Sequence, residues 1–214
     1  MTAYTINFDS IFKFSDEQFY QLCRQNPDVK FESNAQGEII IMAPTGGETG
    51  NRNAEFLIDF GIWNRQNNLG KLFDSSTGFR LPNGAHRSPD VAWVSLERWE
   101  QLTKEQKQKF PPLAPDFVLE LLSPSDSLSI TQNKMREYIE NGVKLGWLIN
   151  QKSKQVEIYR PGQKIEVLVN PESLSGEKVL PGLILNLTEK TLQAQAPSFS
   201  YRDSVGNKFP VKLL

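Results

Sequence analysis

The sequence has little cysteine, little histidine and little net charge, and it lacks a long hydrophobic run. The single cysteine, Cys23, excludes an internal disulfide and fits a reducing cytosol. The single histidine, His86, excludes most zinc sites, which need several His or Cys ligands. No apolar stretch approaches the roughly 20 residues that cross a membrane, and no charged leader precedes an apolar core at the N-terminus. We therefore expect a cytoplasmic protein with no membrane partner.

The charges nearly cancel, since 24 Lys and Arg residues stand against 25 Asp and Glu residues. Such a chain has no general attraction for nucleic acid or anionic lipid, so binding of either requires a local basic patch. Cys23 occupies an apolar position of SDEQFYQLCRQ, which favours packing over catalysis, because only His86 could serve as its base. His86 stands alone in a loop, where we expect it to be solvated.

The residue pattern predicts an α/β protein. Periodic apolar positions and cap residues predict helices over residues 15–25, 49–67, 96–109 and 128–142. Apolar runs between turn residues predict strands at VAWV, FVLELL, VKLGWLIN and LPGLILNL, and alternation predicts hairpins around NAQG and PGQ. The order of FVLELL, a helix and VKLGWLIN favours a parallel crossover. We expect one domain over residues 1–190, and an extension over 191–214 that packs on the body or is partly ordered.

Glu120 stands inside FVLELL, a run that is apolar on both faces. An ionised carboxylate there costs several kcal/mol or more unless it has a partner. The first candidate is Asp90, at the head of the VAWV strand, because adjacent strands would bring the two carboxylates together. Like charges at that range repel unless a divalent cation lies between them, and carboxylate oxygens suit Mg²⁺.

The second candidate partner is Lys134, which interrupts an apolar helix stripe. Ile130, Lys134 and Tyr138 follow one another at intervals of four residues and so share one helix face. The lysine either extends to the surface or points inward at a carboxylate, and Lys144 is the alternative inward cation. A third carboxylate could be Glu48, in the first turn of the helix after APTGG, although the helix dipole is also a sufficient reason for an acid there.

Three segments together resemble the Uma family of restriction-endonuclease-like proteins, within the PD-(D/E)XK nuclease superfamily. They are RSPDVAWV, then PDFVLELLSPSDS, then K-x-x-x-Y ahead of a glycine and WLIN. MAPTGGE is also similar to a segment of that family. The resemblance runs from the first helix to LPGLILNL. It implies a restriction-endonuclease-like core, with a central mixed β-sheet flanked by helices, and a homodimer.

The resemblance also implies roles for individual residues. Asp90 matches the aspartate of the superfamily motif, and Glu120 matches its second acidic residue. The general pattern has a lysine two positions later, where this chain has Leu122. Related families carry the lysine on the following helix, and Lys134 fits that position.

By the same resemblance, Asp90, Glu120 and the backbone carbonyl of Leu121 would hold Mg²⁺ or Mn²⁺. Lys134 would orient the attacking water and stabilise charge in the transition state, with Glu48 as an outer ligand. The implied function is a metal-dependent nuclease that hydrolyses nucleic acid, with DNA as the preferred expectation.

The sequence leaves the substrate contacts and two alternative functions open. The arginines nearest to these motifs, and thus the candidates for phosphate contact, are Arg52, Arg80 and Arg87. One alternative keeps the fold as an inactive scaffold or partner-binding module, since fold does not carry function. The other is a metal-dependent hydrolase of a small phosphodiester.

Overall fold

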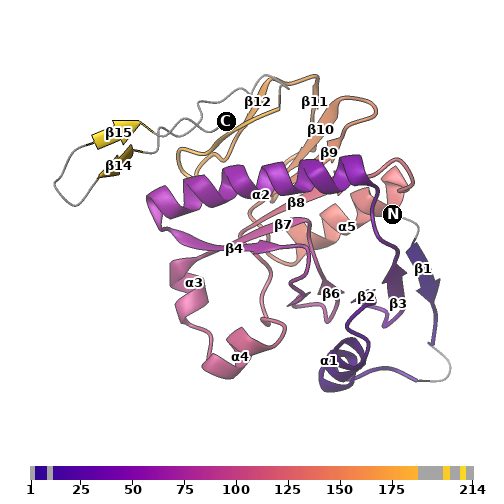
Figure 1. Cartoon of the computed structure of the whole chain (residues 1–214). Helices are drawn as coiled ribbons and strands as arrows, with labels where there is room; N and C mark the ends of the chain where they lie inside the picture. The colour runs from indigo at the N-terminus through magenta and orange to yellow at the C-terminus, as the bar shows by residue number, and fades with distance from the viewer. Residues whose placement is uncertain (1–2, 9–11, 188–199, 203–207, 211–214) are drawn as a thin grey trace.

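The computed structural model describes residues 3–8, 12–187, 200–202 and 208–210 (Figure 1). Its main feature is a six-stranded sheet in the order β11-β10-β9-β8-β7-β4. The strands are β4 (Gly70–Asp74), β7 (Val91–Ser95), β8 (Phe117–Leu122), β9 (Leu145–Asn150), β10 (Gln155–Tyr159) and β11 (Glu166–Val169). β8 and β9 are parallel and the other neighbours are antiparallel, so the predicted mixed sheet and the parallel crossover are confirmed.

A smaller, five-stranded sheet has the order β1-β3-β2-β6-β5. Its strands are β1 (Ala3–Ile6), β2 (Lys30–Ser33), β3 (Ile39–Met42), β5 (Phe79–Arg80) and β6 (His86–Arg87). β2 and β3 form the hairpin predicted around NAQG. After β6 the chain crosses to the larger sheet through residues 88–90 and enters β7.

The helices are α1 (Asp16–Gln25), α2 (Gly47–Asn67), α3 (Leu96–Glu100), α4 (Lys104–Gln108) and α5 (Leu128–Glu140). α1 begins as predicted, because the Ser15 side chain accepts from the Gln18 N–H and the Gln18 side chain accepts from the Ser15 N–H. The single helix predicted over 96–109 is wrong. Thr103 caps a new helix start by accepting from the Gln106 N–H, and this divides the segment into α3 and α4.

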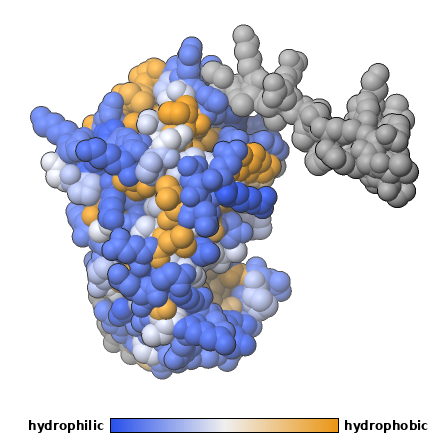
Figure 2. Space-filling model, turned by 90° about the vertical axis from the view of Figure 1, so that its left-hand side faces the viewer, coloured by the Kyte–Doolittle hydropathy of each residue, from blue (hydrophilic) through white to orange (hydrophobic). Residues whose placement is uncertain are grey.

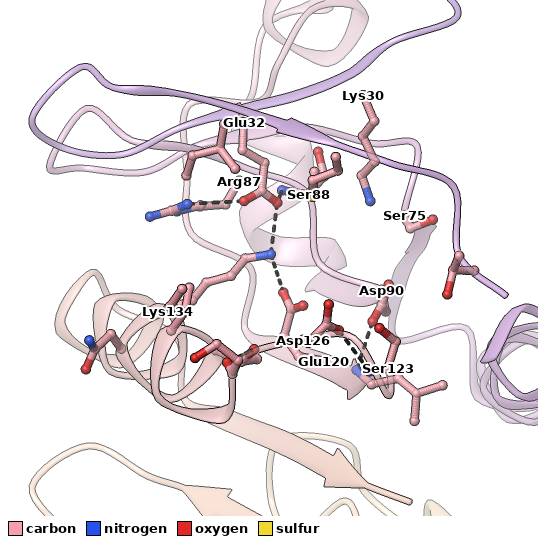
Figure 3. A pocket seen from close by; sticks show the side chains of 18 of the residues that line it. Lys30, Glu32, Ser75, Arg87, Ser88, Asp90, Glu120, Ser123, Asp126 and Lys134 are labelled. Carbon is pink, nitrogen blue, oxygen red and sulfur yellow. Dashed lines mark hydrogen bonds and ion pairs between the residues drawn. The ribbon is translucent and has the colours of Figure 1, made fainter. Parts of the chain in front are cut away.

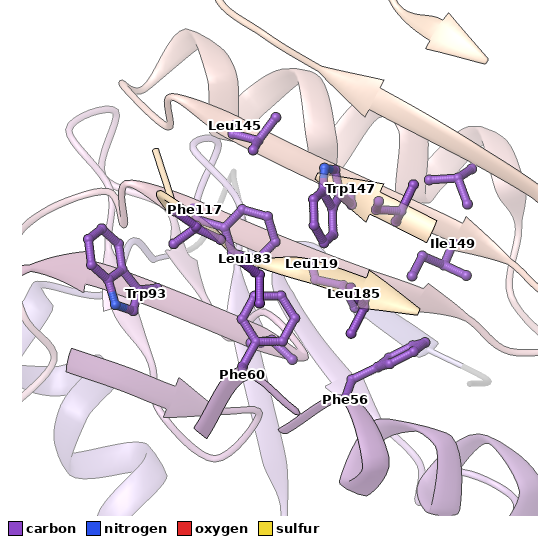
Figure 4. Close-up of a cluster of buried hydrophobic side chains, with 14 of the residues drawn as sticks. Phe56, Phe60, Trp93, Phe117, Leu119, Leu145, Trp147, Ile149, Leu183 and Leu185 are labelled. Atoms are coloured by element: carbon purple, nitrogen blue, oxygen red, sulfur yellow. The ribbon is translucent and has the colours of Figure 1, made fainter. Parts of the chain in front are cut away.

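Two helices cover the two faces of the larger sheet, α2 in front and α5 behind in Figure 1. Because side chains alternate along a strand, Phe117 and Leu119 of β8 pack with Phe60 of α2, whereas Val118 packs with Met135 of α5. Figure 4 shows the α2 side of this core. The core also contains Trp63, Trp93 and Trp147.

The segment LPGLILNL forms a strand outside the larger sheet. It contains β13 (Ile184–Asn186), which pairs with β12 (Ser173–Ser175) in a separate ribbon. Leu183 and Leu185 lie in the cluster under α2 (Figure 4). The segment therefore contributes apolar surface to the core without adding a strand to the main sheet.

Of the C-terminal segment 191–214, the structure describes the antiparallel pair β14 (Ser200–Arg202) and β15 (Lys208–Pro210). The rest of the predicted extension lies outside the described residues. No helix in the described ranges combines the length and hydrophobicity needed to span a membrane. On the face shown in Figure 2, hydrophilic residues predominate and hydrophobic ones form a narrow, interrupted band.

His86 is buried, so the expectation that it is solvated is wrong. It is 5% exposed, its Nδ1 lies 3.0 Å from the Ser33 Oγ, and its ring stacks on Phe19 at 4.4 Å. The pairing of β6 with β2 and the packing of Phe19 of α1 on the His86 ring create this burial. Burial lowers the pKa of His86 to about 4, although the Asp16 carboxylate acts in the opposite direction.

This burial predicts that the stability of the protein depends on pH. His86→Gln should weaken that dependence. The unfolded chain binds a proton near the ordinary histidine pKa of about 6.5, whereas the folded chain binds it only near pH 4. The folded state therefore loses stability as the pH falls from about 6.5 to 4, by an amount on the order of 3 kcal/mol. Urea unfolding of both proteins across this range should show a flatter profile for the variant. Parallel profiles would contradict the assignment, because other titrating groups are common to both proteins.

Cys23, for which the sequence favours packing over catalysis, is half-buried on α1. Burial raises the pKa of its thiol to about 11. The thiolate needed for nucleophilic attack is therefore scarce near neutral pH, in agreement with the packing role predicted for Cys23.

Candidate active site between the two sheets

A pocket of about 770 Å³ lies between the smaller sheet and the end of β8 (Figure 3). Its walls come from β2 and β3 on one side and from α5 and the preceding loop, residues 123–127, on the other. Asp90, Glu120, Leu121 and Lys134 all line it. The pocket therefore gathers residues that are far apart in the sequence.

The register of the larger sheet brings Asp90 and Glu120 together. β7 and β8 pair Val91 with Leu119, and continuing this antiparallel register by one residue sets Asp90 opposite Glu120. Glu120 lies on the same face of β8 as Val118, which is the α5 face, so its carboxylate points away from α2. The Asp90 Oδ2 accepts a 2.8 Å hydrogen bond from the Leu121 N–H, which fixes the aspartate at this strand end.

Lys134 and Tyr138, one helical turn apart on α5, both donate to Glu120. The Lys134 Nζ and the Tyr138 hydroxyl each lie 2.9 Å from the Glu120 Oε1. Glu120 is 7% exposed and Lys134 has a side chain 14% exposed. The lysine thus points inward, whereas Ile130, one turn earlier, is 69% exposed and is not part of an apolar stripe.

A second carboxylate, Glu32 of β2, shares the Lys134 ammonium. The Lys134 Nζ donates to the Glu32 Oε1 at 2.9 Å. Glu32 is 2% exposed, and it also accepts from the Arg87 Nη1 at 3.1 Å and from the Ser88 N–H at 2.9 Å. Glu32 therefore ties the smaller sheet to α5 and to the segment that crosses between the sheets.

The two carboxylates that share Lys134 have opposite pKa shifts. Burial raises the pKa of Glu120 to about 7, and the Asp90 charge adds to this against the effect of Lys134. Burial also acts on Glu32, but Lys134 and Arg87 outweigh it and lower the pKa of Glu32 to about 2. Burial opposes the charge on Lys134, yet the two carboxylates raise its pKa above the ordinary value. Glu32 and Lys134 are thus a fixed ion pair, and Glu120 is the acid that changes its protonation near neutrality.

Asp90 and Glu120 are suitable donors for a divalent cation. In the described part of the chain, no hydrogen bond or ion pair occupies the Asp90 Oδ1 or the Glu120 Oε2. No group of three or more His, Cys, Asp or Glu side chains within the described residues could hold a metal ion. Mg²⁺ needs only one or two carboxylates, because it retains several waters. The donor chemistry therefore fits Mg²⁺ or Mn²⁺, and a cation would offset the repulsion between the two acids.

Two of the residues predicted to contact substrate or metal lie elsewhere. Glu48 is exposed in the first turn of α2 and does not line the pocket, in keeping with a helix-dipole role. Arg52, one turn later, does not line it either. The sequence could not reveal this, because both residues lie within about a turn of Thr49 and Asn53, which do line the pocket.

The remaining predicted cations are engaged by carboxylates. Arg80 pairs with Asp16 of α1 and lines a separate, smaller pocket. Lys144 pairs with Asp116, its Nζ lying 2.8 Å from the Asp116 Oδ1, and does not line the candidate site. Arg87 does line the site, but it is buried and its guanidinium binds Glu32 and Glu137. A structural role explains each of these three side chains.

Sequence reasoning missed Glu32 and Tyr138. Glu32 lies two residues after Lys30 in a short strand, and side chains two apart share a face, so the pair could have been assigned to one side of β2. Nothing local indicates that this side is buried. The sequence spacing sets Tyr138 one turn from Lys134 but suggests no role for it. In the structure this spacing lets both side chains donate to Glu120.

Comparisons with known proteins agree with this architecture. Residues 16–188 match the family model Uma2, described as "Putative restriction endonuclease". A solved structure with the same fold is that of a "putative nuclease belonging to DUF820" from Anabaena variabilis. It has a TM-score of 0.67 and 21% sequence identity, covering 81% of this chain and 94% of that chain. A search of curated proteins gave no match.

Proposed function

The chain belongs to the Uma2 family, as its motifs predicted, and on that premise we propose that it is a metal-dependent nuclease that hydrolyses phosphodiester bonds in DNA. The observation that supports this most is the convergence of Asp90, Glu120 and Lys134 on one pocket. Two acids on adjacent strands and an amine from the next helix supply the charges that phosphodiester hydrolysis needs.

Asp90, Glu120 and the backbone carbonyl of Leu121 are the proposed ligands of Mg²⁺ or Mn²⁺. The cation, when bound, supplies Lewis acidity at the scissile phosphate. Asp90 is preset for this role by its hydrogen bond from the Leu121 N–H, which orients the carboxylate toward the end of β8. Glu120 would hold the cation in its ionised form, and its raised pKa of about 7 leaves that form accessible near neutral pH.

Lys134 is the proposed residue that faces the reacting phosphate. Its pKa is raised, so it stays protonated and cannot serve as a general base. Its role is to orient the attacking water and to stabilise negative charge that develops in the transition state. Glu32 holds the ammonium at 2.9 Å, so Lys134 would keep one carboxylate partner if Glu120 held a cation. Tyr138 donates to Glu120 and holds that carboxylate in place.

Asp90→Asn should abolish most of the metal-dependent cleavage. The amide keeps the shape of the side chain but removes a charge that the cation requires, so we expect a rate loss of about 10²-fold or more. The assay follows plasmid, linear duplex and single-stranded DNA with Mg²⁺, with Mn²⁺ and with EDTA. Calorimetry with Mg²⁺ in the absence of DNA should show weaker binding by the variant.

Glu140→Gln is the matched control, since Glu140 is an exposed carboxylate at the end of α5. It should cleave DNA and bind Mg²⁺ as the wild type does. A wild-type protein that neither binds Mg²⁺ nor cleaves DNA would refute the nuclease proposal and favour an inactive scaffold. Turnover of cyclic dinucleotides without cleavage of DNA would favour a hydrolase of small phosphodiesters instead.

A further inference from the structure

The charged side chains that line the pocket are unequal in number. Three are basic, Lys30, Arg87 and Lys134, and six are acidic, Glu32, Glu38, Asp90, Glu120, Asp126 and Glu137. A phosphate group entering this pocket meets an excess of negative charge, so its binding depends on the few cations that can face it.

Two of the three cations are already held by carboxylates. Arg87 is bound by Glu32 and Glu137, and Lys134 by Glu32 and Glu120. Lys30 differs from both, because no hydrogen bond or ion pair joins its ammonium to another residue in the described ranges. It is half-buried on β2, and Figure 3 shows its side chain extending into the pocket on the same wall as Glu32.

The strands around Lys30 explain this orientation. Lys30 and Glu32 are two residues apart, so both project from the pocket face of β2. Ser33, on the other face, meets His86. The β2–β3 register pairs Lys30 with Met42 and Glu32 with Ile40, and both of these apolar side chains also line the pocket. The wall therefore combines one available ammonium with an apolar surface.

We propose that Lys30 binds a phosphate group of the nucleic-acid substrate, while Met42 and Ile40 contact the adjoining sugar or base. This inference rests on the proposed nuclease function, since it assigns the substrate side of the same pocket. A nucleotide has a charged phosphate and apolar faces, and the β2–β3 wall offers a counterpart to each. In this proposal Lys30 has the phosphate-binding role for which the sequence offered Arg52, Arg80 and Arg87.

Lys30→Met should weaken binding of oligonucleotides without acting on the chemical step. The test uses fluorescence anisotropy with labelled single-stranded and duplex DNA, in a Glu120→Gln background so that the DNA stays intact. We expect Kd to rise about tenfold and the slope of log K against log salt to fall by about one, as for the loss of one phosphate contact. Lys30→Arg should restore much of the binding, because it keeps the charge. Lys152→Met, at an exposed lysine outside the pocket, is the control.

The salt slope separates a phosphate contact from a structural role, since a loss of packing alone would not change the number of released counterions. An unchanged Kd and slope in Lys30→Met, or no oligonucleotide binding by its parent, would overturn the inference. A protein that binds DNA through Lys30 but never cleaves it would support the inference and refute the nuclease activity. If the wild type cleaves DNA and Lys30→Met has no effect on binding, the nuclease proposal is supported and the role of Lys30 is refuted.

Discussion

Glu120→Gln should lower the rate of DNA cleavage by about 10³-fold or more while leaving the protein at least as stable as the wild type above about pH 7. The loss of rate follows from removing a proposed metal ligand. The gain in stability follows from burial, which raises the pKa of Glu120 to about 7. An acid with a raised pKa favours the folded state below its ordinary pKa of about 4.5, and this contribution is lost as the pH rises through 7. Glutamine does not ionise and avoids this loss.

Cleavage assays and urea unfolding of the same preparations would test both halves of this prediction. Glu140→Gln again serves as the exposed control and should match the wild type in each measurement. A variant that loses activity only because it unfolds would contradict the prediction. So would a correctly folded variant that cleaves DNA at the wild-type rate.

Glu32→Gln, unlike Glu120→Gln, should destabilise the folded protein, by about 3–5 kcal/mol. Glu32 is buried and binds both Lys134 and Arg87, and its removal leaves two buried cations each short of a partner. Its pKa is lowered to about 2, so the stabilisation is complete above about pH 4.5 and is lost as the pH falls toward 2. The difference between the variant and the wild type should therefore shrink in acid.

Chemical denaturation at several pH values would measure this difference. Lys134→Met provides a useful comparison, because it removes the ammonium that Glu32 and Glu120 share. Combining it with Glu32→Gln in a double-mutant cycle should give a coupling energy of at least about 1 kcal/mol. Additive effects, or a free energy of unfolding for Glu32→Gln within about 0.5 kcal/mol of the wild type, would show that the pair does not hold the smaller sheet against α5.

The sequence drew attention to Glu120 and Asp90 through their local context, because Glu120 interrupts an apolar strand and Asp90 precedes a core strand. For Lys134 the helix spacing left a surface and an inward orientation open, and only the family resemblance favoured the inward one. Glu32 breaks no such pattern, because its short strand KFES alternates without a clear apolar run and its partner Lys134 is 102 residues away. Its importance arises only when the smaller sheet packs against α5.

The same limit applies to the fold. Hairpins and the parallel crossover were predictable, since each depends on a few neighbouring residues. The burial of His86 was not, because it comes from α1 and β2, which are distant in sequence. The position of β13 outside the main sheet likewise depends on distant contacts, because Leu183 and Leu185 pack in the cluster under α2.

The crossing at residues 88–90 links the two sheets mechanically. The Ser88 N–H is bonded to Glu32 of the smaller sheet, and Asp90 is bonded to the backbone of β8 in the larger one. If one sheet slid over the other, residues 88–90 would be pulled at both ends. Glu32, which holds Lys134, would then move, and the Asp90 carboxylate would be reoriented at the same time. A ligand that separated the two sheets would therefore displace Lys134 and Asp90 together, without contacting Asp90 or Glu120.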